Sequence, residues 1–275
     1  MAGRDIYVIV VLYKVRLTEA VSYKTLIEPN GISEFFVYDN SPAGFGTPDE
    51  CLPPGVRYVR DTSNPGLSHA YNAGAAYARE LGYRRVLLLD QDTHFEAGVW
   101  EEYIRNADYP GIVAPRISTT GGMPFSPTYV GGLRLRGVAL PKGEYPLRRY
   151  GVVNSGCCVP LSLYEEAHGY AEDVPLDFSD FQFQVRAGRC FPRFLLMESR
   201  AVQDFSNDCR DAEKLLSRFK LYLRGASHFR PDGAAAKLRH ILHVALHSAT
   251  LSVRTRSMVF LSLYLKSFRA SRRKG

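Results

Sequence analysis

Val86-Leu87-Leu88-Leu89-Asp90-Gln91-Asp92 is the stretch that decides the fold. Four consecutive apolar residues at its start indicate a short strand buried on both faces, as in a parallel sheet. Asp90 and Asp92 are two positions apart, so in an extended backbone both carboxylates point to one side, just beyond the strand. Mg²⁺ and Mn²⁺ prefer such oxygen ligands, so the stretch predicts a divalent-cation site. The alternative is a strand that runs into an acidic turn, with Asp92 capping a helix.

Strands and helices alternate on the N-terminal side of this stretch. Strands are predicted at 6–12, 35–38, 56–60 and 86–90, and helices at 17–28 (with Thr18 as N-cap) and from Asn64 to Gly82. This alternation predicts an α/β fold with a doubly wound, mostly parallel sheet flanked by helices. Ligands of such sheets bind at the C-terminal ends of the strands. Asp39 and Asp90 both stand at such ends, so we expect them to face one crevice.

The C-terminal half is less regular. We expect irregular strands and Gly-rich loops at 111–149, a strand at 152–159, and helices at 181–187, 215–230 and 238–268. Cys157 and Cys158 are adjacent in an apolar strand, so they are expected to be buried on opposite faces rather than to bind a metal. The chain has five cysteines, without a CxxC pair, which favours reduced thiols in a cytoplasmic protein. No signal peptide is expected, because Arg4 and Asp5 interrupt the start of the chain.

The basic charge of the chain is concentrated at its C-terminal end. Residues 233–275 contain nine Lys and Arg and no acid, so with a net charge of +7 overall the first 232 residues carry −2. The longest run there without Lys or Arg is 14 residues, shorter than the roughly 20 apolar residues that span a membrane. Apolar helices flanked by basic residues suit the surface of an anionic membrane. The alternative is a set of helices packed on the main domain with a solvated basic end. Nucleic-acid binding is not expected, because no binding motif accompanies the charge.

Four segments together carry a resemblance. VIVVLYK (8–14), VYDNSP (37–42), SNPGLSHAYNAGAAYA (63–78) and VLLLDQDT (86–93) resemble the inverting glycosyltransferases of family 2, which have the GT-A fold. LLLDQDT is most similar to the rhamnosyltransferase-like branch that builds bacterial surface polysaccharides. The resemblance covers roughly residues 5–210. It implies a catalytic domain at 1–210, and the basic helices that follow make a separate extension at 211–275.

The resemblance assigns a donor site. In the family, an acid at the position of Asp39 binds the nucleotide base or its ribose, and Asp90 and Asp92 form the DxD motif that holds Mg²⁺ or Mn²⁺ on the diphosphate. The residues implied for nucleotide-sugar binding are Asp39, Asn64, Gly66, Asn72, Asp90, Gln91, Ser155 and Gly156. Simpler alternatives stand beside them: Asp39 fits an Asx turn, and the segment around Asn72 fits small-residue helix packing.

The resemblance also places a general base. Aligned on Arg186, the segment 175–186 puts Asp180 at the position of the base. Asp177, three residues earlier, is the second catalytic candidate and takes the role if the alignment has slipped. Inverting transfer needs a carboxylate that takes the proton of the acceptor hydroxyl. The alternative for Asp180 is a helix N-cap, and one residue can serve as both.

Two positions depart from the family pattern. Gln182 stands where relatives usually have Glu, and Gln203-Asp204 stand where many have a His metal ligand. Either Asp204 is the third metal ligand, with Asp90 and Asp92, or that ligand is missing.

The predicted function is therefore a metal-dependent inverting glycosyltransferase on the cytoplasmic face of the inner membrane. Its expected donor is a dTDP- or UDP-sugar, with dTDP-rhamnose the best single choice, and its acceptor a glycan or polyprenyl-linked glycan. A nucleotidyltransferase is a rival, although Val11-Leu12-Tyr13-Lys14 offers no Gly-rich phosphate loop after the first strand. An inactive glycan- or membrane-binding protein is another, suggested by Gln182 and Gln203.

Overall fold

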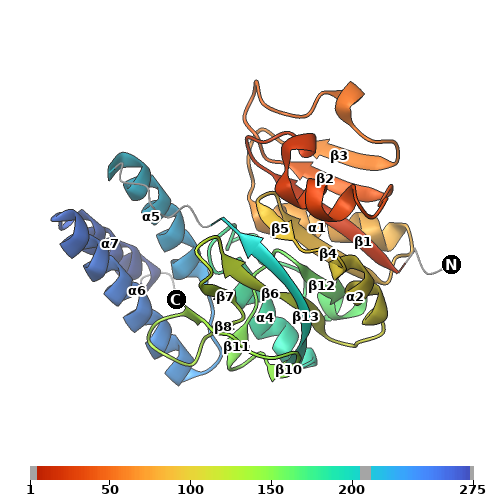
Figure 1. Cartoon of the computed structure of the whole chain (residues 1–275). Helices are drawn as coiled ribbons and strands as arrows, with labels where there is room; N and C mark the ends of the chain where they lie inside the picture. The colour runs from red at the N-terminus through yellow and green to blue at the C-terminus, as the bar shows by residue number, and fades with distance from the viewer. Residues whose placement is uncertain (1–4, 205–211, 273–275) are drawn as a thin grey trace.

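The fold is built around one large mixed sheet, and the computed structural model describes it over residues 5–204 and 212–272. Within those residues the sheet has ten strands, in the order β10-β13-β6-β12-β4-β1-β2-β3, with β5 paired to β13 and β7 to β6. Figure 1 shows the sheet at the centre and three long helices, α5 to α7, at one side.

One half of the sheet is parallel. It consists of β1 (Ile6–Leu12), β2 (Phe35–Asp39), β3 (Val56–Arg60) and β4 (Arg85–Asp90). β1 is buried along its whole length between β2 and β4, as its unbroken apolar run predicts, since parallel strands are covered on both faces. Leu12 pairs with Asp39 and Val11 with Asp90, so these two acids end neighbouring strands at the same edge.

The other half is mixed, and more regular than the sequence suggests. It consists of β6 (Ile112–Thr119), β12 (Cys157–Pro160), β13 (Arg193–Gln203) and β10 (Gly143–Pro146). The irregular strands and Gly-rich loops expected at 111–149 include one longer strand, β6, in which seven residues pair with β13 and Val113 also pairs with β12. β12 is antiparallel to β4 and occupies only the end of the predicted strand 152–159. No strand was expected at 193–203.

Helices cover both faces of the sheet. The first face is covered by α1 (Leu67–Glu80), α3 (Leu161–Glu166) and α4 (Ser179–Cys190), and the second by α2 (Val99–Arg105) and the turns around residue 23. Cys157 packs in the first core and Cys158 in the second. The prediction that the two cysteines are buried on opposite faces is therefore confirmed.

The predicted helix 17–28 does not form as such. Instead, Leu17–Glu19 makes a 3₁₀ turn and Tyr23–Ile27 a π-helical turn, with Arg16 rather than Thr18 at the N-cap position. Ala20 between them is extended, and the Val21 amide donates to the Gln91 carbonyl at 2.7 Å. The chain therefore bends around the end of β4, which a continuous helix would prevent.

Short strands complete the described sheets. β7 (Pro124–Ser126) and β5 (Thr93–Phe95) extend the main sheet. β8 (Thr128–Tyr129), β9 (Arg136–Gly137) and β11 (Tyr150–Gly151) form a separate three-stranded sheet.

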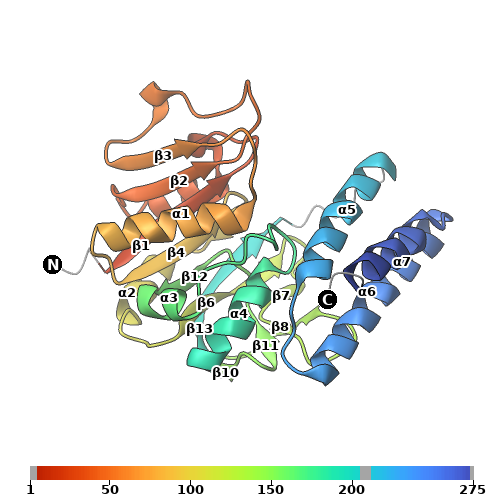
Figure 2. The same cartoon turned by 180° about the vertical axis from the view of Figure 1, so that it is seen from behind.

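The C-terminal helices are α5 (Ala212–His228), α6 (Ala234–Thr255) and α7 (Val259–Arg272). They share a third hydrophobic core with Val174 and Phe178 from the segment that precedes α4. Both views show them as one group packed beside α4 (Figures 1 and 2). None of the described helices combines the length and apolar character needed to cross a membrane.

Candidate active site

The end of β4 holds two carboxylates and is tied to its neighbours by hydrogen bonds. The Tyr71 hydroxyl on α1 donates to Asp90 Oδ1 at 2.8 Å. The Asp90 amide donates to the Ser155 hydroxyl at 3.0 Å, so the predicted Ser155-Gly156 segment does lie beside the DxD motif. Asp92 occupies the turn between β4 and β5, so the alternative that it caps a helix is wrong.

Gln203, at the end of β13, lies against both carboxylates. Its Nε2 group donates to Asp92 Oδ1 at 3.1 Å, and its Oε1 is buried without a partner among the described residues. Burial, with the negative charge of Asp92, raises the pKa of Asp90 to about 6, although hydrogen bonds from Tyr71 and Gln203 oppose the shift. Burial also raises the pKa of Asp92. Two half-buried acids and an unpartnered amide oxygen form an oxygen-donor set that suits Mg²⁺ or Mn²⁺.

The predicted third ligand, Asp204, is not part of this set. Asp204 is exposed at the end of the described segment, although its charge contributes to the raised pKa of Asp92. Over residues 5–204 and 212–272, no group of three or more His, Cys, Asp or Glu side chains is placed to share a metal ion. Gln203 stands close to the position where the sequence resemblance implies a His metal ligand, and it is better placed than Asp204 to contact a metal ion. Metal ligation by Asp204 stays a prediction.

Asp39 is fully buried and holds a loop. Its Oδ1 accepts the Ser41 amide at 2.8 Å and its Oδ2 accepts the Tyr58 hydroxyl at 2.5 Å. The Asx-turn alternative for Asp39 is therefore present in the structure. Asp39 shares the sheet edge with Asp90 but does not line the cavity described below, so its binding to a base stays a prediction.

The segment around α1 joins the sheet edge to the predicted base. Gly66 has a φ of +106°, and a Cβ there would lie 2.6 Å from the Pro175 Cβ, so only glycine allows this approach. Both ends of the Asn72 side-chain amide have partners within the protein. Its Nδ2 donates to the Tyr170 carbonyl, and its Oδ1 accepts from the Tyr170 amide and the Tyr164 hydroxyl. Exposed Asn64 has a φ of +51°. Nucleotide contacts by these residues stay predictions.

Gln91 and Gly156 have local structural roles. The Gln91 amide bonds the Tyr13 backbone at 2.7 and 3.2 Å and so pins the loop after β1. Gly156 has a φ of +82° and donates its amide to the Leu88 carbonyl at 2.7 Å. Their direct contact with a nucleotide sugar is untested.

Asp180 faces the same cavity as Asp90. This cavity of about 370 Å³ is also lined by Gln203, Asn154 and Asp177. Burial raises the pKa of Asp180 to about 7. The negative charges of Asp177 and Asp90 also raise this pKa, whereas a hydrogen bond from the Phe181 amide lowers it. A carboxyl with a pKa near neutrality suits general-base work.

The N-cap alternative for Asp180 is wrong. α4 begins at Ser179, and Phe178, with a φ of +67°, occupies the N-cap position. The early start follows from a turn in which the Ser179 amide donates to the Leu176 carbonyl at 3.2 Å. Asp180 therefore lies inside the first turn, with its side chain at the cavity wall.

Asp177 is paired, in contrast to Asp180. The Arg218 guanidinium of α5 donates to both of its carboxylate oxygens, with 2.7 Å between Nη2 and Oδ1. A Cβ on Gly225 would lie 2.2 Å from the Asp177 carbonyl oxygen, so α5 packs directly on this turn. Because Asp177 is held in an ion pair, Asp180 is the better placed of these two carboxylates to accept a proton.

Sequence reasoning missed the part that the C-terminal helices play in this cavity. Arg218 and Tyr222 of α5 and His243 of α6 line it. The signal available was the apolar face of these helices, which predicts packing against another surface but not which one. The prediction of a separate extension at 211–275 is not tested by these contacts.

Comparison with solved structures places the fold among glycosyltransferases. The chain is similar to GalNAc-T7 with UDP, GalNAc and Mn²⁺ (TM-score 0.54, 12% identity, 86% of this chain and 53% of that one). It is similar to S. aureus TarS (TM-score 0.52, 14%, 92% and 45%) and to TarS 1–349 with UDP-GlcNAc (TM-score 0.51, 14%, 89% and 73%). The fold is GT-A.

These similarities extend to the fold alone. The chain spans about half the length of GalNAc-T7 and of full TarS. No family model matches the chain, and no curated protein matches it by sequence.

Proposed function

We propose that the protein is an inverting glycosyltransferase that takes its sugar from a nucleotide-sugar donor. The observation that carries the proposal is the shared cavity of Asp90 and Asp180, one at the end of β4 and the other at the start of α4. Transfer needs a group that receives the leaving diphosphate and a base opposite to it, and one cavity supplies both. The GT-A fold, and the UDP and UDP-GlcNAc bound by similar structures, support the same reading.

Asp90 and Asp92, with the Gln203 amide oxygen, would hold the divalent cation. When bound, Mg²⁺ or Mn²⁺ would neutralise the negative charge that builds on the departing nucleoside diphosphate. The protein's own residues do the rest: Tyr71 and Ser155 fix the end of β4, and Asp180 takes the proton from the acceptor hydroxyl.

The finer assignment follows the sequence resemblance. The donor is a dTDP- or UDP-sugar, with dTDP-rhamnose the best single candidate, and the acceptor is a glycan, free or polyprenyl-linked. Family 2 membership and the rhamnosyltransferase-like branch rest on the four sequence segments that end with LLLDQDT. The expected setting is polysaccharide synthesis at the cytoplasmic face of the inner membrane.

The C-terminal helices supply the proposed membrane contact. α6 carries an exposed apolar stripe, which is spaced to lie on one face: Leu238, Leu242, Leu246 and Val253. Residues 233–275 carry nine basic residues and no acid. Apolar area next to positive charge is what an anionic membrane surface binds.

A thermal-shift panel tests the donor site. UDP, dTDP, GDP and ADP are each added with and without Mn²⁺. We expect stabilisation by UDP or dTDP, enhanced by Mn²⁺, since ligands that bind only the native state raise its melting temperature. Lack of stabilisation by every nucleotide with Mn²⁺ would count against the proposal.

A further inference from the structure

A second cavity adjoins the one that contains Asp180. It measures about 390 Å³ and lies between α4, the small β8-β11 sheet and α6. Phe178, Phe181, Leu135 and His243 line both cavities, so the two are neighbours that share a wall. A ligand held in the second cavity is therefore placed on the side of Asp180, away from the metal-binding edge of β4.

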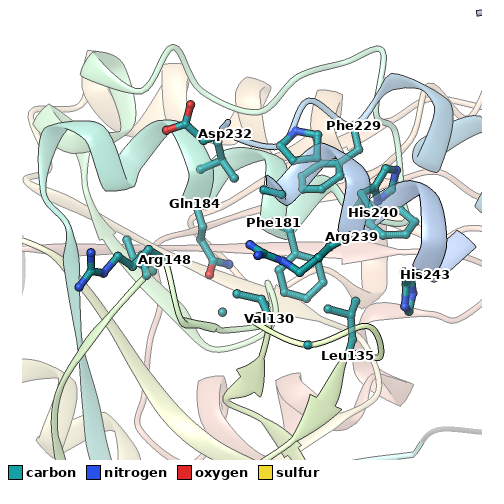
Figure 3. A pocket seen from close by; sticks show the side chains of 17 residues that line it. Val130, Leu135, Arg148, Phe181, Gln184, Phe229, Asp232, Arg239, His240 and His243 are labelled. Atoms are coloured by element: carbon teal, nitrogen blue, oxygen red, sulfur yellow. The ribbon is translucent and has the colours of Figure 1, made fainter. Parts of the chain in front are cut away.

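The walls of this second cavity are mostly apolar. Beyond the shared residues, Figure 3 shows Val130, Phe229 and the buried face of α4 around it. A cavity of this size with few polar groups is typical of a small-molecule site.

All but two of the polar side chains that line this cavity already form a hydrogen bond or an ion pair within the protein. The Gln184 amide bonds both the amide and the carbonyl of Val152. His240 contacts the Ala226 carbonyl at 2.7 Å and His243 the Leu133 carbonyl at 3.1 Å. Asp232 pairs with Arg189 at 3.0 Å. A bare saccharide, whose hydroxyls each need a hydrogen-bond partner, would find few here.

The exceptions are two arginines. Arg148 and Arg239 line the cavity, and no hydrogen bond or ion pair to either is found within residues 5–204 and 212–272. Figure 3 shows the Arg239 side chain reaching from α6 into the cavity towards Gln184 and Phe181. Arg148 is exposed and Arg239 is half-buried, so Arg239 is the guanidinium placed to donate to phosphate oxygens within the cavity.

We propose that this cavity binds the lipid-phosphate part of the acceptor, with an apolar chain against Phe181 and Phe229 and the phosphate on Arg239. The inference rests on the proposed function, since it gives the acceptor class for the same site. Leu238, the residue before Arg239, is 58% exposed and belongs to the apolar stripe of α6. One helix thus supplies both the wall of the cavity and the proposed membrane-facing surface.

Isothermal titration with farnesyl diphosphate, in the presence of saturating UDP and Mn²⁺, tests the proposal on the full chain. Farnesol and inorganic pyrophosphate are the matched probes. We expect farnesyl diphosphate to bind at least tenfold more tightly than either, because only it satisfies both the apolar wall and Arg239. Binding of pyrophosphate or of farnesol as tight as that of farnesyl diphosphate would overturn the proposal.

Two variants locate the probe. Arg239→Gln should weaken binding by roughly tenfold or more, as expected for a lost charge-assisted hydrogen bond. Arg224→Gln, which removes an exposed charge from α5 outside the cavity, should leave it unchanged. Ala236→Phe should block the apolar chain, with an unchanged melting temperature as the check on folding. If Arg224→Gln weakens binding as much as Arg239→Gln, the probe binds by surface charge and the proposal fails.

The proposal and the glycosyltransferase function can fail separately. Donor turnover on a soluble sugar acceptor without farnesyl diphosphate binding would refute the lipid-phosphate site alone. Farnesyl diphosphate binding that depends on Arg239, in a protein that turns over no nucleotide sugar, would refute the function and keep the site.

Discussion

Arg218 of α5 and Asp177 form a two-pronged ion pair that joins the C-terminal helices to the turn carrying Asp180. The Asp177 side chain is 20% exposed and that of Arg218 is 48% exposed. Arg218 thereby offsets the negative charge of Asp177, the acid nearest to Asp180 in the sequence. The C-terminal helices therefore influence the predicted base as well as the shape of its cavity.

Removal of Arg218 should change the pH dependence of transfer. Arg218→Gln leaves Asp177 as an unpaired negative charge, which raises the pKa of Asp180 further. The acidic limb of the rate profile should move to higher pH, and stability should fall by about 1 kcal/mol for a pair that is partly exposed. Asp177→Asn combined with Arg218→Gln should move the limb back. Arg189→Gln, which breaks an exposed pair with Asp232, is the control. An unmoved limb in Arg218→Gln would refute this coupling.

The charge of half-buried Asp180 should cost stability. Its pKa of about 7 lies above the ordinary value of 3.8, so the folded protein loses stability as the pH rises from about 4 through 7. Asp180→Asn should therefore be more stable than the wild type at pH 8, by about 1–3 kcal/mol, and equal to it near pH 4. Urea unfolding at both pH values measures this. A variant less stable than the wild type at pH 8 would contradict the burial argument.

Metal affinity should depend on Gln203 more than on Asp204. Gln203 contacts Asp92 and presents a buried, unpartnered oxygen, whereas Asp204 is exposed. Asp92→Asn should abolish Mn²⁺ binding measured by titration calorimetry. Gln203→Leu should weaken Mn²⁺ binding by about tenfold. A larger loss in Asp204→Asn than in Gln203→Leu would instead make Asp204 the third ligand.

Binding to anionic vesicles should depend on the exposed stripe of α6. Removal of α7 is a poor test, since Phe260 is buried in the C-terminal core. Leu242→Gln with Leu246→Gln, or Arg254→Gln with Arg256→Gln, should weaken flotation with anionic vesicles without unfolding. Each basic residue contributes about 1 kcal/mol near such a surface, and added salt should screen it. Equal flotation of the wild-type protein with neutral and anionic vesicles, or no flotation with either kind, would contradict the electrostatic account of membrane binding.

The sheet was predictable from sequence where local patterns are strong. The unbroken apolar runs before Asp39 and Asp90 could be recognised as strands because a parallel strand is buried on both faces. β13 was missed because Arg193, Glu198 and Arg200 interrupt its apolar residues, and pairing with β6, β10 and β5 makes the segment a strand. The helix expected at 17–28 failed because hydrogen bonds to Gln91, distant in sequence, bend the chain.

The same distinction holds for the site. Asp90, Asp92 and Asp180 were predicted as site residues from short motifs, and the structure brings Asp90 and Asp180 to one cavity, while their roles stay predictions. The pairing of Asp177 with Arg218 spans 41 residues, and the second cavity joins α4 to α6. Such contacts depend on how helices pack, which the periodicity of a single helix does not specify.

The most direct test of the account is release of nucleoside diphosphate from a nucleotide sugar with Mn²⁺ present. dTDP-rhamnose and UDP-GlcNAc are compared as donors, first with water and then with a lipid-linked acceptor. The wild-type protein should release diphosphate, and Asp180→Asn should be slower by roughly 10²–10⁴-fold with donor binding preserved. Asp177→Asn should keep most of the activity. Absence of release from any nucleotide sugar, or a wild-type rate in Asp180→Asn, would contradict the account.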